Sequence, residues 1–271
     1  MTKLNFGCGL RFASGWINID FHSEHAEVQR VNLLQRWPFP DNHFEAVYSS
    51  HTLEHFSLPV GESLLRECWR VAKPGGILRI VVPDLENTCR EYLRVLEQTP
   101  ASELARRQYD WMIVELLDQL TRTQPGGLMG AYRLRLQASG DQEMMQYVRS
   151  RTDTNPVGSA GPPTARDRLK KLTLNKLRNK LIYVYVAAVK KLLPPGLREA
   201  MLDNSRIGEK HRWMYDRFNL EQTMLRCGFS EVTFQCPEVS SIPGFKQDCL
   251  DVNPDGSVYK PTSLYCEGRK R

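Results

Sequence analysis

The sequence lacks the features that mark secreted and membrane-spanning proteins. Its seven cysteines form no CxxC pair and are odd in number, which argues against a disulfide framework or a structural zinc site. The longest uncharged apolar run covers residues 181–189 and is too short to cross a bilayer. The first strand-like run begins at Lys3, which leaves no room for a signal peptide. We therefore expect a cytoplasmic protein.

A general excess of one charge is also lacking. The net charge is +6, but residues 1–85 contain eight Lys/Arg and nine Asp/Glu, whereas residues 166–191 contain nine Lys/Arg and a single acid. The basic excess is thus a local patch, and it says little about the ligand of the rest of the chain. No motif that reads nucleic-acid bases accompanies it, so we expect no nucleic-acid partner.

Strand-like and helix-like segments alternate over the first 85 residues. A helix with one apolar face is expected over residues 61–72, ended by Lys73-Pro74-Gly75-Gly76. Strands are expected at residues 4–6, 16–20, 30–33, 46–50 and 77–82, and again at 231–236 and 263–266. This alternation predicts an α/β fold, a Rossmann-like, doubly wound, mostly parallel sheet.

A long segment between these strand-rich parts has no strand pattern. We predict a core of residues 1–85 and 215–271, interrupted by a helical insertion at 86–214. One of its helices should cover residues 103–122. Because the insertion follows the fifth strand, we expect it to cover the carboxyl edge of the sheet and to determine which acceptor molecule binds there.

Two further features of the insertion can be read from its composition. Residues 152–164 are rich in Gly and Pro, which predicts a mobile loop. Residues 165–193 predict a basic amphipathic helix, halted by Pro194. Such a helix either lies on an anionic membrane surface, at the inner face of the membrane, or packs its apolar stripe on the core or a second subunit, and the second arrangement is the more common.

A glycine pair follows the first expected strand. Gly7-Cys8-Gly9 lets the backbone pass close to a ligand, because glycine has no Cβ. The GxGxxG dinucleotide fingerprint is incomplete, since position 12 is Phe, and Asp20 follows Gly9 by only 11 residues instead of about 20. Asp20 can accept hydrogen bonds from both ribose hydroxyls, and the loop offers little room for a pyrophosphate. The pattern favours a nucleoside without phosphates; the alternative is a glycine turn and a surface aspartate.

Five segments carry a resemblance in their order and spacing. They are Leu4–Gly9, Gly15–Asp20, Ser49–His55, Arg66–Gly76 and Val82–Glu86. Together they resemble the motif series of bacterial class I S-adenosylmethionine-dependent methyltransferases, in the group often found with polysaccharide and glycosyl-transfer functions. The resemblance covers residues 3–86 and, more loosely, 208–267. It implies that fold, an antiparallel last strand, and S-adenosylmethionine as the cofactor.

The resemblance also assigns the cofactor site. It implies that Gly7, Cys8 and Gly9 line the methionine and the ribose and that Asp20 holds the ribose. Asn5, Ser49 and Ser50 belong to the same motifs and are assigned to the same site. The chain departs from the family at Asn32-Leu33, where many members have Asp-Leu with the acid on the adenine amino group. Asn32 can still accept from that amine through its side-chain oxygen.

Methyl transfer from a sulfonium needs alignment and, for a hydroxyl acceptor, a base, and histidine is the natural base near neutral pH. His51 follows the fourth strand and is our first candidate, with His55 beside it. His211 is the second; its segment resembles one that returns to the active site in the family, and the alternative is that it ties the insertion to the core. Asp84 follows the fifth strand and either touches the substrate or caps the next helix.

The segment His51-Thr52-Leu53-Glu54-His55 also matches the inverted zinc-protease pattern HxxEH. That motif needs a helix carrying both histidines and a third ligand elsewhere, whereas here a strand is expected to end at Ser50. We therefore expect no metal ligands. Two alternatives stay open: a divalent ion at His51, Glu54 and His55 that helps to bind substrate, or hydrogen bonds from Glu54 and His55 to neighbouring backbone.

The function expected from the sequence is O-methylation of a hydroxyl on a sugar, a glycan or a related metabolite, so the expected partner is a small-molecule or glycan acceptor. The sugar rests on the family analogy alone. A non-enzymatic S-adenosylmethionine-binding scaffold, whose basic helix recruits a partner or a membrane, is the first alternative. A dinucleotide oxidoreductase is the second, and the missing third glycine argues against it.

Overall fold

The computed structural model describes residues 1–23, 25–122, 126–152 and 210–271, together with the isolated positions 185, 189, 192 and 194. The predicted mobile loop at 152–164, apart from Thr152, and the predicted basic helix at 165–193, apart from three of those positions, lie outside the described residues. The chain divides into two compact units, Met1–Thr154 with Gly208–Arg271, and Asn155–Ile207. The sheet and its flanking helices belong to the first unit. Among the described residues, no helix is long and apolar enough to cross a membrane.

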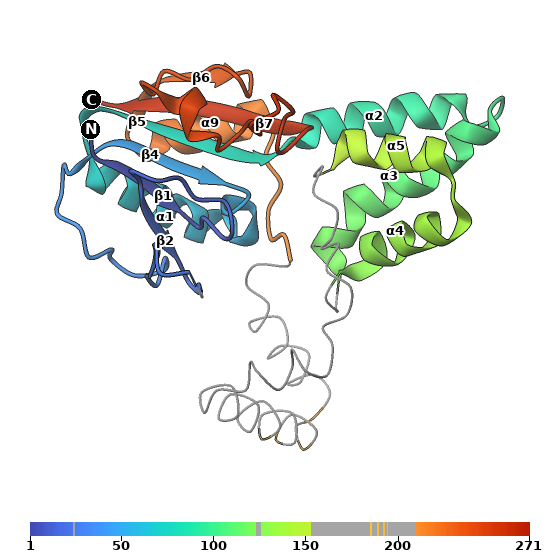
Figure 1. The fold of residues 1–271 in the computed structure, drawn as a ribbon, viewed down its shortest axis with the longest axis horizontal. Coiled ribbons are helices and arrows are strands. Elements are labelled where there is room, and N and C mark those ends of the chain that lie inside the picture. The colour runs from blue at the N-terminus through green and yellow to red at the C-terminus, as the bar shows by residue number, and fades with distance from the viewer. Residues whose placement is uncertain are drawn as a thin grey trace. The chain divides into compact units, whose positions relative to one another are not determined.

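The core is a seven-stranded sheet in the order β3-β2-β1-β4-β5-β7-β6 (Figure 1). The strands are β1 (Lys3–Phe6), β2 (Ile17–Asp20), β3 (Val28–Arg30), β4 (Phe44–Ser50), β5 (Ala72–Pro83), β6 (Phe229–Gln235) and β7 (Ser263–Lys270). The first five pair in parallel, and β7 runs antiparallel to both β5 and β6. This confirms the predicted Rossmann-like fold with its antiparallel last strand.

Several strand boundaries differ from the prediction. β3 occupies Val28–Arg30 instead of residues 30–33, because the Asn32 side-chain oxygen accepts the Leu34 N–H and turns the chain there. β5 starts at Ala72, five residues earlier than predicted. Its first pairing, Phe44 with Ala72, is separated from the rest by a register shift that takes up the Pro74-Gly75 segment. β7 extends to Lys270 because it is paired on both sides.

Helices cover one face of the sheet. They are α1 (Leu58–Val71) and α9 (Arg217–Arg226), and both place apolar residues in the main core cluster, Leu65 and Met224 among them. The opposite face packs against the segment between β6 and β7, with its short 3₁₀ turn Phe245–Asp248. Since both faces are covered, the central strands are apolar on both sides, as parallel strands usually are.

A buried ion cluster fixes that segment to the sheet. Arg79 of β5 is fully buried, and its guanidinium donates to Asp251 at 2.7 Å and to Glu267 at 2.8 Å. The Tyr48 hydroxyl donates to the second oxygen of Asp251 at 2.5 Å. Three charges are thus withdrawn from water together, which is tolerable only because both carboxylates accept hydrogen bonds from the Arg79 guanidinium.

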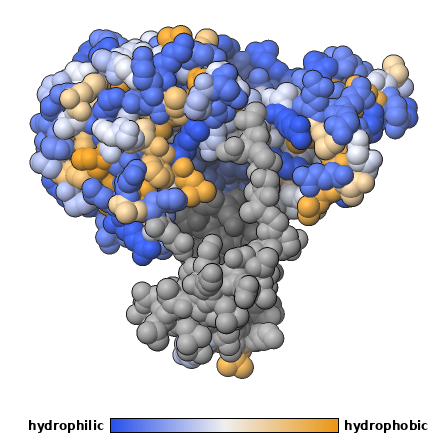
Figure 2. All heavy atoms as spheres, viewed as in Figure 1, coloured by the Kyte–Doolittle hydropathy of each residue, from blue (hydrophilic) through white to orange (hydrophobic). Residues whose placement is uncertain are grey.

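The described part of the predicted insertion is helical. It contains α2 (Leu85–Gln98), α3 (Glu103–Thr121), α4 (Gly127–Ser139) and α5 (Gln142–Arg151), and α3 agrees with the helix predicted over 103–122. α2 begins directly after β5 ends, and the four helices share a small core of their own around Trp111 and Met112 (Figure 1). Hydrophilic residues cover most of the visible face of the described part, with apolar patches between them (Figure 2).

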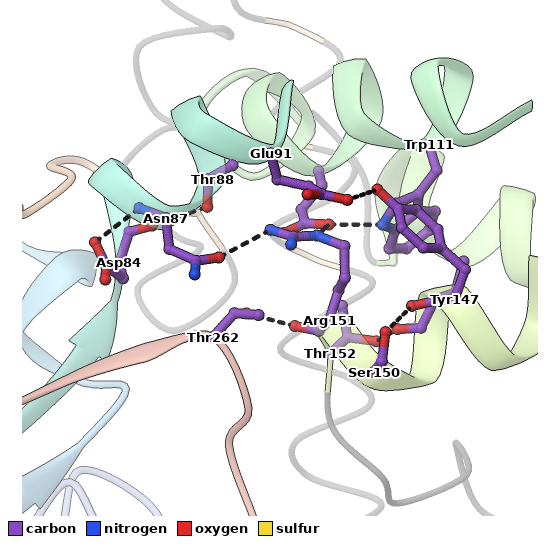
Figure 3. A network of polar contacts seen from close by, with 12 residues as sticks. Asp84, Asn87, Thr88, Glu91, Trp111, Tyr147, Ser150, Arg151, Thr152 and Thr262 are labelled. Carbon is purple, nitrogen blue, oxygen red and sulfur yellow. Dashed lines mark hydrogen bonds and ion pairs between the residues drawn. The ribbon is translucent and has the colours of Figure 1, made fainter. Parts of the chain in front are cut away.

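One polar network joins these helices to each other and to the core (Figure 3). Arg151, at the end of α5, donates two hydrogen bonds to Glu115 of α3, and Trp111 donates to the same carboxylate. The Thr262 hydroxyl, just before β7, donates to the Arg151 carbonyl at 2.6 Å. The last described turn of the helical segment is therefore held at the carboxyl end of β5, where α2 also starts.

Candidate active site

The predicted cofactor residues meet at the carboxyl ends of β1, β2 and β4, where ligands bind in open α/β sheets. A pocket opens there. Its lining is Asn5, Gly7, Cys8, Gly9, Leu10, Arg11, Tyr48, Ser50, His51, Tyr259 and Lys260. The glycine loop and the first candidate base therefore share one pocket, although 42 residues separate Gly9 from His51 in the chain.

The two glycines are needed for different reasons. Gly7 has φ +62°, and a Cβ there would lie 2.3 Å from the Thr52 hydroxyl oxygen. Gly9 has φ +52°, and a Cβ there would meet no atom of the described residues within 4 Å. Glycine at position 7 thus lets two protein segments touch, whereas glycine at position 9 leaves the pocket side of the loop bare for a ligand.

Asp20, at the tip of β2, holds the loop. Its Oδ2 accepts the Gly9 N–H at 2.8 Å, and its Oδ1 accepts the His22 N–H at 3.2 Å. Each carboxylate oxygen has a second lone pair, so both remain able to accept from ribose hydroxyls. Burial, together with the nearby Asp20 charge, raises the pKa of the Cys8 thiol to about 12. Cys8 therefore lines the pocket as a neutral thiol.

Two polar atoms in the lining point to a ligand with hydrogen-bonding groups. Asn5 donates through Nδ2 to the Arg11 carbonyl and to Asn18, but within the described part of the chain its buried Oδ1 has no hydrogen-bond partner. The same holds for the buried hydroxyl oxygen of Ser50. Buried polar groups are normally paired, so a bound polar molecule would supply the hydrogen bonds that these two atoms lack. A nucleoside with an amino-acid tail, such as S-adenosylmethionine, fits that requirement.

Four of the residues assigned to the cofactor lie outside the lining, namely Asp20, Ser49, Leu33 and Asn32. The Ser49 hydroxyl donates to the Phe6 carbonyl at 2.8 Å and thereby joins β4 to β1. The Leu33 side chain is buried in the main core cluster. Asn32 is exposed, and its side-chain oxygen serves the turn after β3. In this structure these side chains support the fold around the pocket.

His51 is the first residue after β4 and has φ +51°, an unusual conformation for a residue with a side chain. Its N–H donates to the Val81 carbonyl, its Nε2 lies 2.8 Å from the Ser263 hydroxyl oxygen, and its Nδ1 lies 3.4 Å from Glu54 Oε1. Burial and the neighbouring Lys260 charge hold the pKa of His51 well below its ordinary value. The ring is therefore neutral near pH 7.

Glu54, His55 and His211 gather behind the pocket and are not part of its lining. Leu53–His55 forms a single 3₁₀ turn, so His51 and His55 do not share the helix that the HxxEH motif requires. Burial raises the pKa of Glu54 to about 8 and, with the nearby His55, lowers that of His211 to about 3. His211 is bound to Gln119 of α3 through both its backbone N–H and its Nε2.

Asp84 acts as a helix cap. It precedes α2, and its side chain accepts the Asn87 N–H at 3.1 Å. Burial raises the pKa of its carboxyl. Asp84 does not belong to the pocket lining among the described residues, so its geometry corresponds to the capping alternative.

Sequence reasoning missed five residues of the lining, namely Leu10, Arg11, Tyr48, Tyr259 and Lys260. Arg11 stacks on the Tyr259 ring, with its guanidinium carbon 4.2 Å from the ring centroid, and donates to the Leu250 and Val252 carbonyls. Tyr259 and Lys260 come from the segment before β7, which reaches the pocket only through the fold. No sequence motif occurs in this segment, and only its aromatic residues could have indicated that it lines a pocket.

Comparison with known proteins agrees with this site. Residues 5–80 match the family model described as a methyltransferase domain. No sequence among the curated proteins matches the chain. Solved structures similar to it include a SAM-dependent methyltransferase from Thermotoga maritima, at 12% identity over 100% of this chain and 82% of that one, with a TM-score of 0.38.

Two further solved structures illustrate how the identity and the covered share of the chain vary among such matches. A SAM-dependent methyltransferase from Archaeoglobus fulgidus has 11% identity over 99% of this chain and 86% of its own, with a TM-score of 0.38. The [4+2]-cyclase SpnF has 24% identity over 30% of this chain and 38% of its own, with a TM-score of 0.25. The chain thus spans well under half the length of SpnF, and it spans 47% of the Haloferax volcanii protein solved in complex with Trm112.

The matched domain begins within β1 and ends within β5, so it contains the whole glycine loop, Asp20 and the end of β4. Residues 5–80 are thus similar to a methyltransferase domain, and the strand order with the antiparallel β7 is that of a Rossmann-like class I fold. The match to this domain implies S-adenosylmethionine as the cofactor.

Proposed function

We propose that the protein methylates a hydroxyl oxygen of a sugar, a glycan or a related metabolite, with His51 as the base. The observation that carries this proposal is the position of His51, whose side chain lines the same pocket as Gly7, Cys8 and Gly9. The bound cofactor supplies an electrophilic methyl group. An oxygen acceptor also has to lose its proton, and a histidine beside the cofactor is suited to take it.

The surroundings of His51 favour Nε2 as the atom that receives the proton. Nδ1 faces Glu54 Oε1 at 3.4 Å, so its proton is directed towards a carboxylate. Nε2 lies 2.8 Å from the Ser263 hydroxyl oxygen, so an acceptor hydroxyl would take the place of Ser263 at this nitrogen. An acceptor hydroxyl in that place would be aligned with the base before the reaction starts.

The polar lining supports a polar acceptor. Arg11 and Lys260 bring two positive groups to the pocket, and Tyr259 brings an aromatic ring with a hydroxyl. Such a lining suits a molecule rich in hydroxyl groups better than an apolar one. The proposal that the acceptor is a sugar rests on the resemblance to methyltransferases found with polysaccharide functions.

The test measures transfer of a labelled methyl group from S-adenosylmethionine to a panel of sugars and oligosaccharides. His51→Gln should lower kcat by about 10²- to 10⁴-fold, the usual value of general base catalysis, and leave cofactor affinity unchanged. His43→Gln is the matched control, because His43 precedes the opposite end of β4. Full turnover in His51→Gln would remove His51 as the base. Cofactor binding without turnover on any hydroxyl acceptor would favour the scaffold alternative.

A further inference from the structure

Three side chains from distant parts of the chain lie close together outside the pocket lining. Hydrogen bonds between them do not satisfy their buried polar atoms. Glu54 and His55 follow β4, and His211 lies where the chain returns to the core. One ligand atom from each of the three lies within 4.8 Å of the others. We propose that Glu54, His55 and His211 bind a divalent transition-metal ion of the zinc type.

The carboxylate is the clearest sign of a missing partner. Glu54 is fully buried, and among the described residues neither of its oxygens has a hydrogen-bond partner. Burial without a partner favours the protonated form, in agreement with the raised pKa of Glu54, and proteins otherwise pair such carboxylates or use them to coordinate metals. His55 Nε2 lies 4.0 Å and His211 Nε2 3.9 Å from Glu54 Oε1, so both rings face the oxygen without bonding to it.

The outer contact of the His55 ring is that of a metal ligand, whereas the outer nitrogen of His211, Nδ1, has no hydrogen-bond partner among the described residues. His55 donates through Nδ1 to the Lys210 carbonyl at 3.2 Å, which leaves the lone pair of Nε2 on the side of Glu54. Metal-binding histidines usually donate their other ring N–H to a carbonyl or carboxylate in this way. Gln119 Nε2 lies 3.0 Å from His211 Nε2, and a half-turn of this carboxamide would present its oxygen as a fourth ligand.

The donor set selects the kind of metal. Two imidazoles with one carboxylate suit Zn²⁺ and its transition-metal neighbours, whereas Mg²⁺ and Ca²⁺ prefer oxygen ligands throughout. Ligands about 2.0–2.1 Å from a tetrahedral Zn²⁺ lie about 3.3 Å apart. The separations of 3.9 and 4.0 Å to Glu54 therefore need to shorten by less than about 1 Å, and the separation between the two histidine ligand atoms, which is within 4.8 Å, by up to about 1.5 Å, which side-chain rotations can supply.

Two cations lie near this cluster. Arg122 is paired with Asp118 at 2.7 Å, so its charge is largely neutralised, and Lys260 lines the cofactor pocket. The positive charge of Lys260 disfavours the binding of a metal cation nearby, so the metal affinity depends on the number of anionic ligands. Glu54 is the one anionic member of the set, so its charge should carry most of the affinity.

The ion would connect three parts of the active site. Arg212 and Trp213 already donate their N–H groups to the Glu54 carbonyl, at 2.7 and 3.2 Å, so the returning segment is docked on this residue. Metal bound to His211 would fasten that segment to the end of β4. It would also fix the carboxylate that faces His51 Nδ1.

The test uses the full chain and does not depend on activity. Protein stripped with a chelator is titrated with Zn²⁺ by calorimetry, and with Co²⁺ by visible absorption, whose intensity reports the coordination geometry. We expect one equivalent of Zn²⁺ per chain and a higher melting temperature with the metal. His22→Ala, which alters an exposed histidine, should behave as the wild type.

Glu54→Gln and His55→Ala should each lower the Zn²⁺ affinity at least tenfold and weaken the Co²⁺ absorption. Without metal, Glu54→Gln should melt at the same temperature as the wild type or higher, because it removes a buried unpaired carboxylate; this shows that the variant folds. Absence of stoichiometric binding by the wild type, or undiminished binding by Glu54→Gln, would overturn the proposal. Methyl transfer is measured separately, so either proposal can fail alone.

Discussion

Replacing Gly7 with alanine tests the geometry of the loop on which the cofactor site depends. The new Cβ would lie 2.3 Å from Thr52 Oγ1, 2.4 Å from its Cγ2 and 2.9 Å from its Cβ. Thr52 cannot easily move away, because a β-branched side chain has few rotamers and its hydroxyl donates to the Gly7 carbonyl. The substitution therefore creates both an overlap and a strained backbone.

The two contributions can be estimated separately. An alanine at φ +62° costs about 1–2 kcal/mol relative to a right-handed conformation. Overpacking against a rigid neighbour adds about 1–3 kcal/mol. Gly15 provides a matched control, because it has φ +81° but a Cβ there would meet no described atom within 4 Å. Gly15→Ala should therefore lose only the stability that the backbone strain costs.

The assay is urea unfolding followed by circular dichroism, with free energies from linear extrapolation. Gly7→Ala should be less stable than Gly15→Ala by about 1–3 kcal/mol. Thr52→Ala removes two of the three close atoms, so the double variant should recover part of this difference in a double-mutant cycle. Equal stability of the two single variants, with no coupling to Thr52, would refute the close approach of these segments.

Two further predictions concern buried groups. With its pKa raised to about 12, Cys8 should react with iodoacetamide at pH 8 roughly 10³-fold more slowly than the exposed Cys236, as peptide mapping would measure; equal rates would contradict this. Arg79→Met should cost about 3–5 kcal/mol, because Asp251 and Glu267 lose their buried partner. Burial already raises the pKa of Asp251, and losing Arg79 raises it further, so the folded variant binds more protons than the unfolded chain. Its unfolding free energy should thus fall as pH rises above about 4, the ordinary pKa of an aspartate, and a flat profile would show that the carboxylates reach water.

The mostly parallel sheet and the position of the glycine loop could be predicted because their signals are local. Gly7, Gly9 and Asp20 each follow or end a strand, and the carboxyl ends of parallel strands meet at one edge of a sheet. The end of β3 was predicted wrongly, because the Asn32 turn depends on a side-chain hydrogen bond that hydrophobic pattern does not report.

Other parts of the site depend on contacts between distant residues. Tyr259 and Lys260 reach the pocket because the buried Arg79–Asp251 pair holds their segment against the sheet, and no local pattern encodes that pairing. The convergence of His211 on Glu54 likewise spans more than 150 residues. The motif around His211 predicted that this residue lies near the active site. Only the folded structure shows that it lies beside Glu54 and outside the pocket lining.

The central claim is that the Gly7–Gly9 loop and Asp20 bind S-adenosylmethionine. Titration calorimetry of the wild type and Asp20→Ala, with S-adenosylhomocysteine and with NADH, tests it most directly. We expect micromolar binding of S-adenosylhomocysteine, much weaker binding of NADH, and a loss of about 10- to 100-fold in Asp20→Ala, the value of charged hydrogen bonds to the ribose. Tighter binding of NADH, or unchanged affinity in Asp20→Ala, would contradict it.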